Sequence, residues 1–230
     1  MNSTFNALLS TVFLSFFFKC TFAQETQKVS RTQTNPNYTI NEKYSVLKAN
    51  PEVKHGLYSA SISRYSELGE YDHDKKIGVW ECFDDGKLVQ RYDFGSQTFL
   101  LGAETKMIVE VEQLDDQGNL VRKLITKGVY FGGDAKLSAI MLRSMRYPAD
   151  AQQNDIQGTV IIDAIISKEG NVIKEKAITN IGYGLEQEAL RVFKSLPSDW
   201  VPTIVDGKAV DVKVKMKMSF RLSHLPAPKG

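Results

Sequence analysis

The residues best suited to catalysis are scarce in this sequence. Its three histidines are His55, His73 and His224, and no Cys or Ser motif of a nucleophilic enzyme lies near any of them. Nucleophilic catalysis requires a nucleophile, a base and a group that orients the base. We therefore predict no catalytic residues and a protein that is not an enzyme, although a site assembled from residues far apart in the chain stays open.

Metal binding is the other chemistry that these side chains could support. The run Asp72, His73 and Asp74 offers two carboxylates and an imidazole, which are ligand types that zinc accepts. Adjacent polar groups in a turn are usually solvated, so we expect no metal and no cofactor. Cys20 and Cys82 can form at most one disulfide and cannot make a zinc site by themselves.

Composition excludes several classes of protein. The 230 residues are 42% hydrophobic and 24% charged, which is typical of a soluble globular chain and leaves room for one large or two small folded units. Lys and Arg total 29 against 27 Asp and Glu, a net charge of +2. So small a charge predicts neither a nucleic-acid partner nor an electrostatic attraction to membranes.

The first 23 residues predict export. An uncharged apolar run covers residues 7–18 and is followed by Lys19 and by small residues at Thr21 and Ala23. A membrane-spanning helix needs about 20 apolar residues, so this shorter run favours a cleavable signal peptide over an inner-membrane anchor. The mature chain would keep Cys82 as its single thiol. We therefore expect a location in the bacterial periplasm.

The first half of the mature chain has strand-like patterns. Residues 24–44 are polar without clear periodicity and predict a flexible leader. Residues 45–127 hold short β-like runs separated by turns of Asp and Gly, which predicts a β-meander. Its aromatic side chains at alternating positions are expected to fill a core. These residues are Tyr58, Trp80, Phe83 and Tyr92.

The second half, residues 128–222, has mixed patterns, and residues 223–230 are a tail. Asp134 is placed to cap a helix that Pro148 stops, and residues 185–196 predict a second helix. From Val210 to Leu222, apolar residues alternate with polar ones, which predicts a strand with one buried face. Gly132–Gly133 could surround a phosphate, but the Lys and Ser/Thr of a P-loop are missing.

Both halves resemble known families. The segment Gly56–Tyr92, in which Gly followed by an apolar and an aromatic residue recurs, resembles MORN-type repeats. Residues 147–222 resemble the TonB C-terminal domain because its motif residues occur in order. These motif residues are Tyr147, Pro148, Gly158, Gly170, Trp200, Pro202 and Phe220. The expected fold is therefore α+β, with a β-meander of MORN-like repeats before a small domain of two helices on an antiparallel sheet.

The TonB resemblance implies binding of TonB-box peptides of outer-membrane receptors by β-strand addition to the edge near the C-terminus. That edge would consist of Val212, Lys213, Val214, Lys215, Met216, Lys217 and Met218. Its lysines would favour acidic peptides, but lysines on an exposed strand equally serve to discourage unwanted edge pairing. Trp200 and Pro202 are expected to fix the turn between helix and strand.

The predicted function is that of a periplasmic TonB-like protein that reaches membranes only through its partners. A role in energy-dependent transport across the outer membrane is open, because a full transducer would carry an inner-membrane helix and a Pro-rich spacer. Residues 24–147 contain only Pro36 and Pro51. The alternative is a structural scaffold of the envelope without energy transduction. A homodimer that pairs edge strands is a further possibility.

Overall fold

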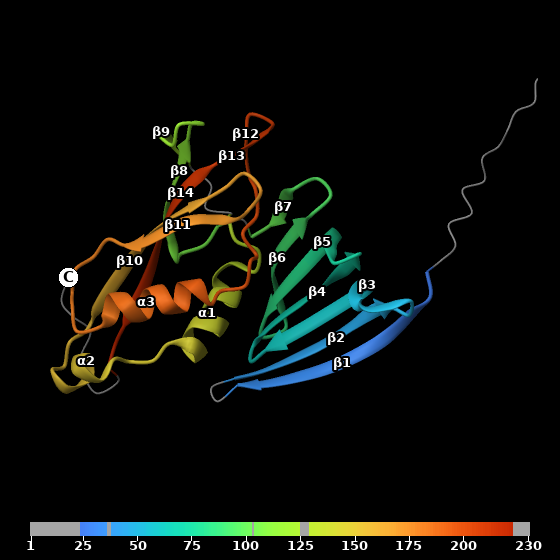
Figure 1. Cartoon of the computed structure of the whole chain (residues 1–230), viewed down its shortest axis with the longest axis horizontal. Coiled ribbons are helices and arrows are strands. Elements are labelled where there is room, and N and C mark those ends of the chain that lie inside the picture. Colours follow the sequence, from blue (N-terminus) through green and yellow to red (C-terminus); the bar gives the residue numbers. More distant parts are fainter. Residues whose placement is uncertain (1–23, 36–37, 103, 125–128, 223–230) are drawn as a thin grey trace, which may run out of the picture.

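The computed structural model describes residues 24–35, 38–102, 104–124 and 129–222. Figure 1 shows a curved antiparallel sheet beside a second body of sheet and helices, so the chain is α+β as predicted. The predicted signal peptide (1–23) and tail (223–230) lie outside the described residues.

The first sheet is a seven-stranded meander in which each strand pairs with the next. Its strands are β1 (Thr26–Asn35), β2 (Tyr38–Leu47), β3 (Asn50–Ile62), β4 (Tyr65–Asp72), β5 (Lys75–Asp84), β6 (Lys87–Asp93) and β7 (Thr98–Leu101). The prediction of a flexible leader over 24–44 is wrong, because β1 and β2 pair along ten consecutive residues. Most of the β1 side chains are exposed, so this strand lacks the apolar alternation by which strands are recognised.

An aromatic core covers one face of the meander. Trp80 is fully buried and contacts the rings of Tyr58 and Phe131 at centroid distances of 5.4 and 5.8 Å. Gly69 makes room for the indole, since a Cβ at this position would lie 2.0 Å from the Trp80 ring. Phe131 comes from outside the meander, so the core is completed by the second half of the chain.

The second sheet has five strands in the order β11-β10-β14-β8-β9. They are β8 (Ile108–Leu114), β9 (Leu120–Lys123), β10 (Gly158–Ile166), β11 (Val172–Ala177) and β14 (Val212–Phe220). A small ribbon of β12 (Thr203–Val205) and β13 (Lys208–Val210) precedes β14. The predicted alternation holds along β14, whose apolar side chains face the core.

The predicted domain boundary near residue 128 is too late in the sequence. Strands β8 and β9 belong to the C-terminal sheet, so residues 45–127 do not form one unit. Ile108 and Val111 of β8 are buried in the C-terminal core. The sheets therefore change between β7 and β8, that is, between residues 101 and 108.

The described residues also form three helices: α1 (Gly133–Ser144), α2 (Ala149–Gln153) and α3 (Leu185–Lys194). Helix α3 packs on β10 and β11, and α1 lies between the two sheets (Figure 1). Leu137 of α1 enters the C-terminal core, whereas Ala139 packs against the aromatic core. Helix α1 therefore contributes to both cores. Among the described residues, no helix is long and apolar enough to cross a membrane.

The start of α1 differs from the prediction. Its N-cap is Gly132, which has a positive φ of 95°, and no side chain caps the helix. Asp134 lies in the first turn instead, where its carboxylate accepts the backbone N–H groups of Lys106 at 2.7 Å and Met107 at 3.1 Å. The carboxylate thus fastens the segment that leads into β8 to the beginning of α1.

Candidate functional site: the C-terminal sheet and the pocket between the sheets

Strand β14, the predicted peptide-binding edge, lies in the middle of its sheet. It pairs with β10 along its whole length and with β8 from Val212 to Met216. The Lys217 N–H continues this side by donating to the Met107 carbonyl at 2.9 Å. The prediction that β14 is an edge strand is therefore wrong. The strand on this side, β8, lies about a hundred residues before β14 in the chain. A local sequence pattern cannot indicate a pairing over such a separation.

The side chains predicted for the edge are also engaged. Those of Val212, Val214, Met216 and Met218 are buried in the core. On the other face, Lys213 lies 2.5 Å from Glu112 and Lys215 lies 2.5 Å from Glu110. Glu110 and Glu112 belong to β8, so an acidic strand of the same chain occupies the position predicted for an acidic peptide.

The open edges of this sheet are β9 and β11. Strand β9 has only four residues, all exposed. Strand β11 is longer, and its register with β10 is fixed by the Ile178 N–H, which donates to the Ile161 carbonyl at 2.9 Å. Because N–H groups alternate sides along an antiparallel strand, those of Glu175 and Ala177 point away from β10. Lys174 and Lys176 are exposed beside them.

The TonB-like motif residues build the fold. The Tyr147 hydroxyl donates to the Ile156 carbonyl at 2.6 Å, and its ring contacts Phe220 at a centroid distance of 5.9 Å. Pro148 is the N-cap of α2. Gly158 begins β10, where a Cβ would lie 2.6 Å from Ile181. Gly158 is the register partner of Phe220, so these contacts join one end of the C-terminal sheet, where β10 begins and β14 ends, to α2.

Trp200 is the centre of a second group of motif residues. Its ring contacts Tyr130 and Phe193 at centroid distances of 5.0 and 5.7 Å, and it is 6% exposed. Gly170 has a φ of 83°, and a Cβ on it would lie 2.5 Å from the Trp200 carbonyl oxygen and 3.8 Å from Pro202. The β10–β11 turn therefore packs directly on the Trp200 segment.

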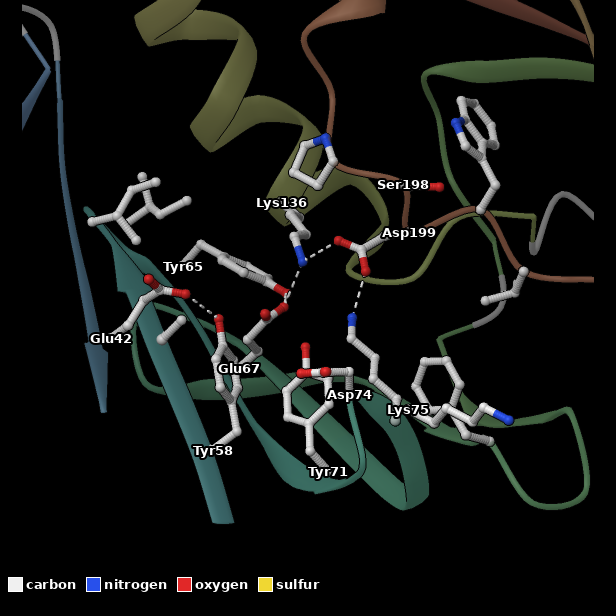
Figure 2. Close-up of a pocket in the computed structure, with 18 of the residues that line it drawn as sticks. Glu42, Tyr58, Tyr65, Glu67, Tyr71, Asp74, Lys75, Lys136, Ser198 and Asp199 are labelled. Carbon is white, nitrogen blue, oxygen red and sulfur yellow. Dashed lines mark hydrogen bonds and ion pairs between the residues drawn. The ribbon is translucent and has the colours of Figure 1, made fainter. Parts of the chain in front are cut away.

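A pocket of about 770 Å³ lies between the two sheets, and Figure 2 shows its polar lining. Lys136 of α1 is only 4% exposed. Its Nζ atom lies 2.6 Å from Glu67 Oε2 on β4 and 2.6 Å from Asp199 Oδ2 in the segment after α3. Asp199 also forms an ion pair with Lys76 of β5. The Tyr65 hydroxyl donates to Glu67 at 2.6 Å.

Charge pairing keeps Lys136 and Asp199 ionised despite their burial. Burial alone would lower the pKa of Lys136, but the carboxylates of Asp199 and Glu67 outweigh it and hold that pKa well above its ordinary value. Burial would likewise raise the pKa of Asp199, yet Lys136 and Lys76 lower it. Two cations thus face two carboxylates, as buried charges require. The network fastens α1 and the Asp199 segment to the first sheet.

The pocket lacks an activated nucleophile among the residues that the structure describes. Burial raises the pKa of the Tyr58 and Tyr71 hydroxyls above their ordinary value, so both phenols stay protonated at neutral pH. Burial also raises the pKa of the nearby Cys82 thiol to about 12. The sequence offered one sign of this pocket: Lys136 lies four residues before Ile140, on the buried side of a helix.

Comparison with known proteins identifies the segment that contains β10, β11, α3 and β14. Residues 143–222 match the family described as the Gram-negative bacterial TonB protein C-terminal. This segment is a TonB C-terminal domain. Protein TonB of Vibrio cholerae serotype O1 (strain ATCC 39315 / El Tor Inaba N16961) is 32% identical over 78 residues, which are 34% of this chain and 31% of that protein. The resemblance deduced from the motif residues is confirmed.

The chain thus spans about a third of the length of the curated relative that it matches. No solved structure matches the chain. The matched residues exclude β8 and β9. In this protein, the TonB C-terminal domain therefore carries on β14 a strand that comes from outside the domain.

Proposed function

We propose that this protein is a periplasmic, non-enzymatic TonB-like protein that binds TonB-box-type peptides of outer-membrane receptors by β-strand addition at β11. The TonB C-terminal domain supports an outer-membrane receptor as the kind of partner. The observation that carries the proposal is the open edge of β11, six residues long, at the end of that domain's sheet. An extended peptide can pair with such an edge as an added strand.

The β11 edge has both main-chain and side-chain groups for a peptide. The N–H groups of Glu175 and Ala177 point away from β10. Each new main-chain hydrogen bond to a peptide contributes about 1 kcal/mol net. Ile173 is 59% exposed and offers apolar contact. Lys174 and Lys176 favour acidic residues in the peptide, as was predicted for the lysines of β14.

Binding at β14 would require the release of β8. The side chains of Ile108, Val111 and Leu114 are at most 7% exposed, and exposing each costs about 1.5–3 kcal/mol. Release of β8 would therefore cost roughly 5–9 kcal/mol of free energy, before the ion pairs of Lys213 and Lys215 are counted. Addition at β11 requires no such release, which is why we place the peptide there.

Two features of the chain support the proposed envelope location. The apolar run at residues 7–18 favours export, and the TonB C-terminal domain fits a protein that meets outer-membrane receptors. A soluble periplasmic protein that begins at Gln24 is the expected product. Intact-mass measurement of the protein from its native host tests this, since a detergent-extracted species that retains Met1 would indicate an inner-membrane anchor instead.

A structural scaffold remains the second candidate, and one observation favours it. The face of the first sheet that points away from the aromatic core exposes Leu57, Leu68 and Val79, with exposed fractions of 75%, 45% and 46%. These side chains line a groove of about 850 Å³. If the meander is MORN-like, as we propose, this groove is a contact surface for another envelope protein.

Titration of purified residues 24–230 with fluorescent TonB-box peptides tests the proposed function. Saturable binding that is stronger for the cognate sequence than for its scrambled version is the expected result. If cognate and scrambled peptides bind alike, or neither binds, peptide recognition is wrong and the scaffold function is favoured. Sedimentation at the same concentrations identifies homodimers, which would use the same edge.

A further inference from the structure

Three potential metal ligands meet at one end of the first sheet. His55 lies on β3, Asp72 ends β4, and His73 begins the turn to β5. One ligand atom from each lies within 4.8 Å of the others. Asp72 Oδ1 is 2.6 Å from His73 Nδ1 and 3.2 Å from His55 Nδ1. Two of the three histidines in the chain therefore converge on one carboxylate.

The backbone holds these ligands in place. Strands β3 and β4 pair with Gly56 opposite Tyr71, so the next pair in register is His55 opposite Asp72. The two-residue turn that follows has a positive φ at His73 (48°) and at Asp74 (65°), as in tight β-hairpins. The Asp74 N–H donates to the Lys54 carbonyl at 2.9 Å. The turn is thereby fastened to the residue that precedes His55.

One ligand atom has no hydrogen-bond partner. His55 Nδ1 is buried and makes no hydrogen bond, although Asp72 Oδ1 lies 3.2 Å away. A buried polar nitrogen without a hydrogen bond is costly, and an ion bound here would satisfy it. The carboxylate is close enough to share an ion with this nitrogen.

We propose that His55, Asp72 and His73 bind a divalent transition-metal ion, with Zn²⁺ as the best fit and water as a fourth ligand. Zinc binds imidazole nitrogen and carboxylate oxygen at about 2.0–2.2 Å in tetrahedral geometry, which places neighbouring ligands about 3.4 Å apart. The separation of His55 and Asp72 already approaches this value. The 2.6 Å between Asp72 Oδ1 and His73 Nδ1 would have to lengthen to about 3.4 Å, and the ligand atoms of His55 and His73, which lie within 4.8 Å of each other, would have to take the same spacing. The His73 side chain is 51% exposed on the turn, which leaves space for this adjustment.

The site would stabilise the sheet end beside the pocket. Asp74, the neighbour of His73, lines that pocket (Figure 2), so an ion would join β3 and the β4–β5 turn at its rim. The proposal does not depend on peptide binding at β11, which lies in the other sheet. Asp72 and His73 are neighbours in the sequence, whereas the third ligand, His55, lies 17 residues before Asp72 and is brought to them by the pairing of β3 with β4.

Calorimetric titration of untagged, chelator-treated residues 24–230 with ZnCl₂ tests the site, with MgCl₂ as the control cation. We expect one Zn²⁺ per chain, a rise in Tm with Zn²⁺ and no response to Mg²⁺. His73→Gln and His55→Gln should each weaken Zn²⁺ binding at least tenfold, whereas His224→Gln, the matched control, should leave it unchanged.

Circular dichroism establishes that each variant is folded. If His55→Gln fails to fold, the exposed His73→Gln and Asp72→Asn variants carry the test. The proposal is overturned if wild-type protein takes up no Zn²⁺, or if Zn²⁺ binding survives in His73→Gln with unchanged affinity.

Discussion

Replacement of Lys136 by Met should be among the most destabilising changes to this protein. The side chain is buried, with its Nζ atom 2.6 Å from Glu67 and 2.6 Å from Asp199. Removal of one partner from a buried ion pair typically costs about 3–5 kcal/mol, because an uncompensated charge stays behind. Asp199 keeps Lys76 in the variant, so the uncompensated charge is that of Glu67. We therefore expect a loss of about 3–5 kcal/mol in the free energy of unfolding.

Urea unfolding followed by tryptophan fluorescence measures this loss in both halves. Trp80 lies in the aromatic core and Trp200 in the C-terminal core. The double variant Lys136→Met, Glu67→Gln should recover part of the loss, because it removes the unpaired carboxylate together with the lysine. A loss below about 1 kcal/mol for Lys136→Met alone would show that this network does not fasten α1 and the Asp199 segment to the first sheet.

The strand order, the boundary between the sheets and the buried Asp199 carboxylate each have a measurable consequence. Lys215→Pro should unfold the protein, or lower its free energy of unfolding in urea several times more than Lys215→Ala, because proline removes a hydrogen-bond donor inside the sheet. Equal losses for the two variants would show that β8 does not pair with β14 at this residue. A fragment of residues 128–230 should melt without cooperativity in circular dichroism, whereas a fragment of residues 104–230, which includes β8, should show a cooperative transition. Identical melting curves for the two fragments would contradict the revised boundary. Because the pKa of Asp199 is lowered in the folded protein, its carboxylate stabilises the fold fully above the unfolded pKa of about 3.9, and this stability is lost as pH falls toward the folded pKa. The urea midpoint of the wild type should therefore fall more steeply below about pH 4 than that of Asp199→Asn.

Local patterns in the sequence predicted the C-terminal domain well. The alternation along β14, the apolar face of α3 and the Gly170 turn each depend on residues close together in the chain. Periodicity reports which face of an element is buried, and turn chemistry reports where the chain reverses. These signals suffice for a segment whose elements follow one another directly.

The remaining features depend on contacts between distant residues. Alternation shows that one face of β14 is buried but not which strands flank it, so β8 was not foreseen as the neighbour of Lys213 and Lys215. Lys136 meets a glutamate 69 residues earlier, and no spacing rule connects such residues. The β1–β2 hairpin was missed because its exposed, polar side chains resemble a linker.

Amide hydrogen exchange of the free and peptide-bound protein tests the central claim most directly. In the free protein, the amides of Glu175 and Ala177 should exchange quickly, because they face away from β10, whereas those of Lys213 and Lys215 should be protected by β8. A TonB-box peptide should slow exchange at Glu175 and Ala177 and leave the β14 amides unchanged. Unchanged exchange at β11, together with faster exchange across β8, would contradict strand addition at β11 and show that the peptide displaces β8 instead.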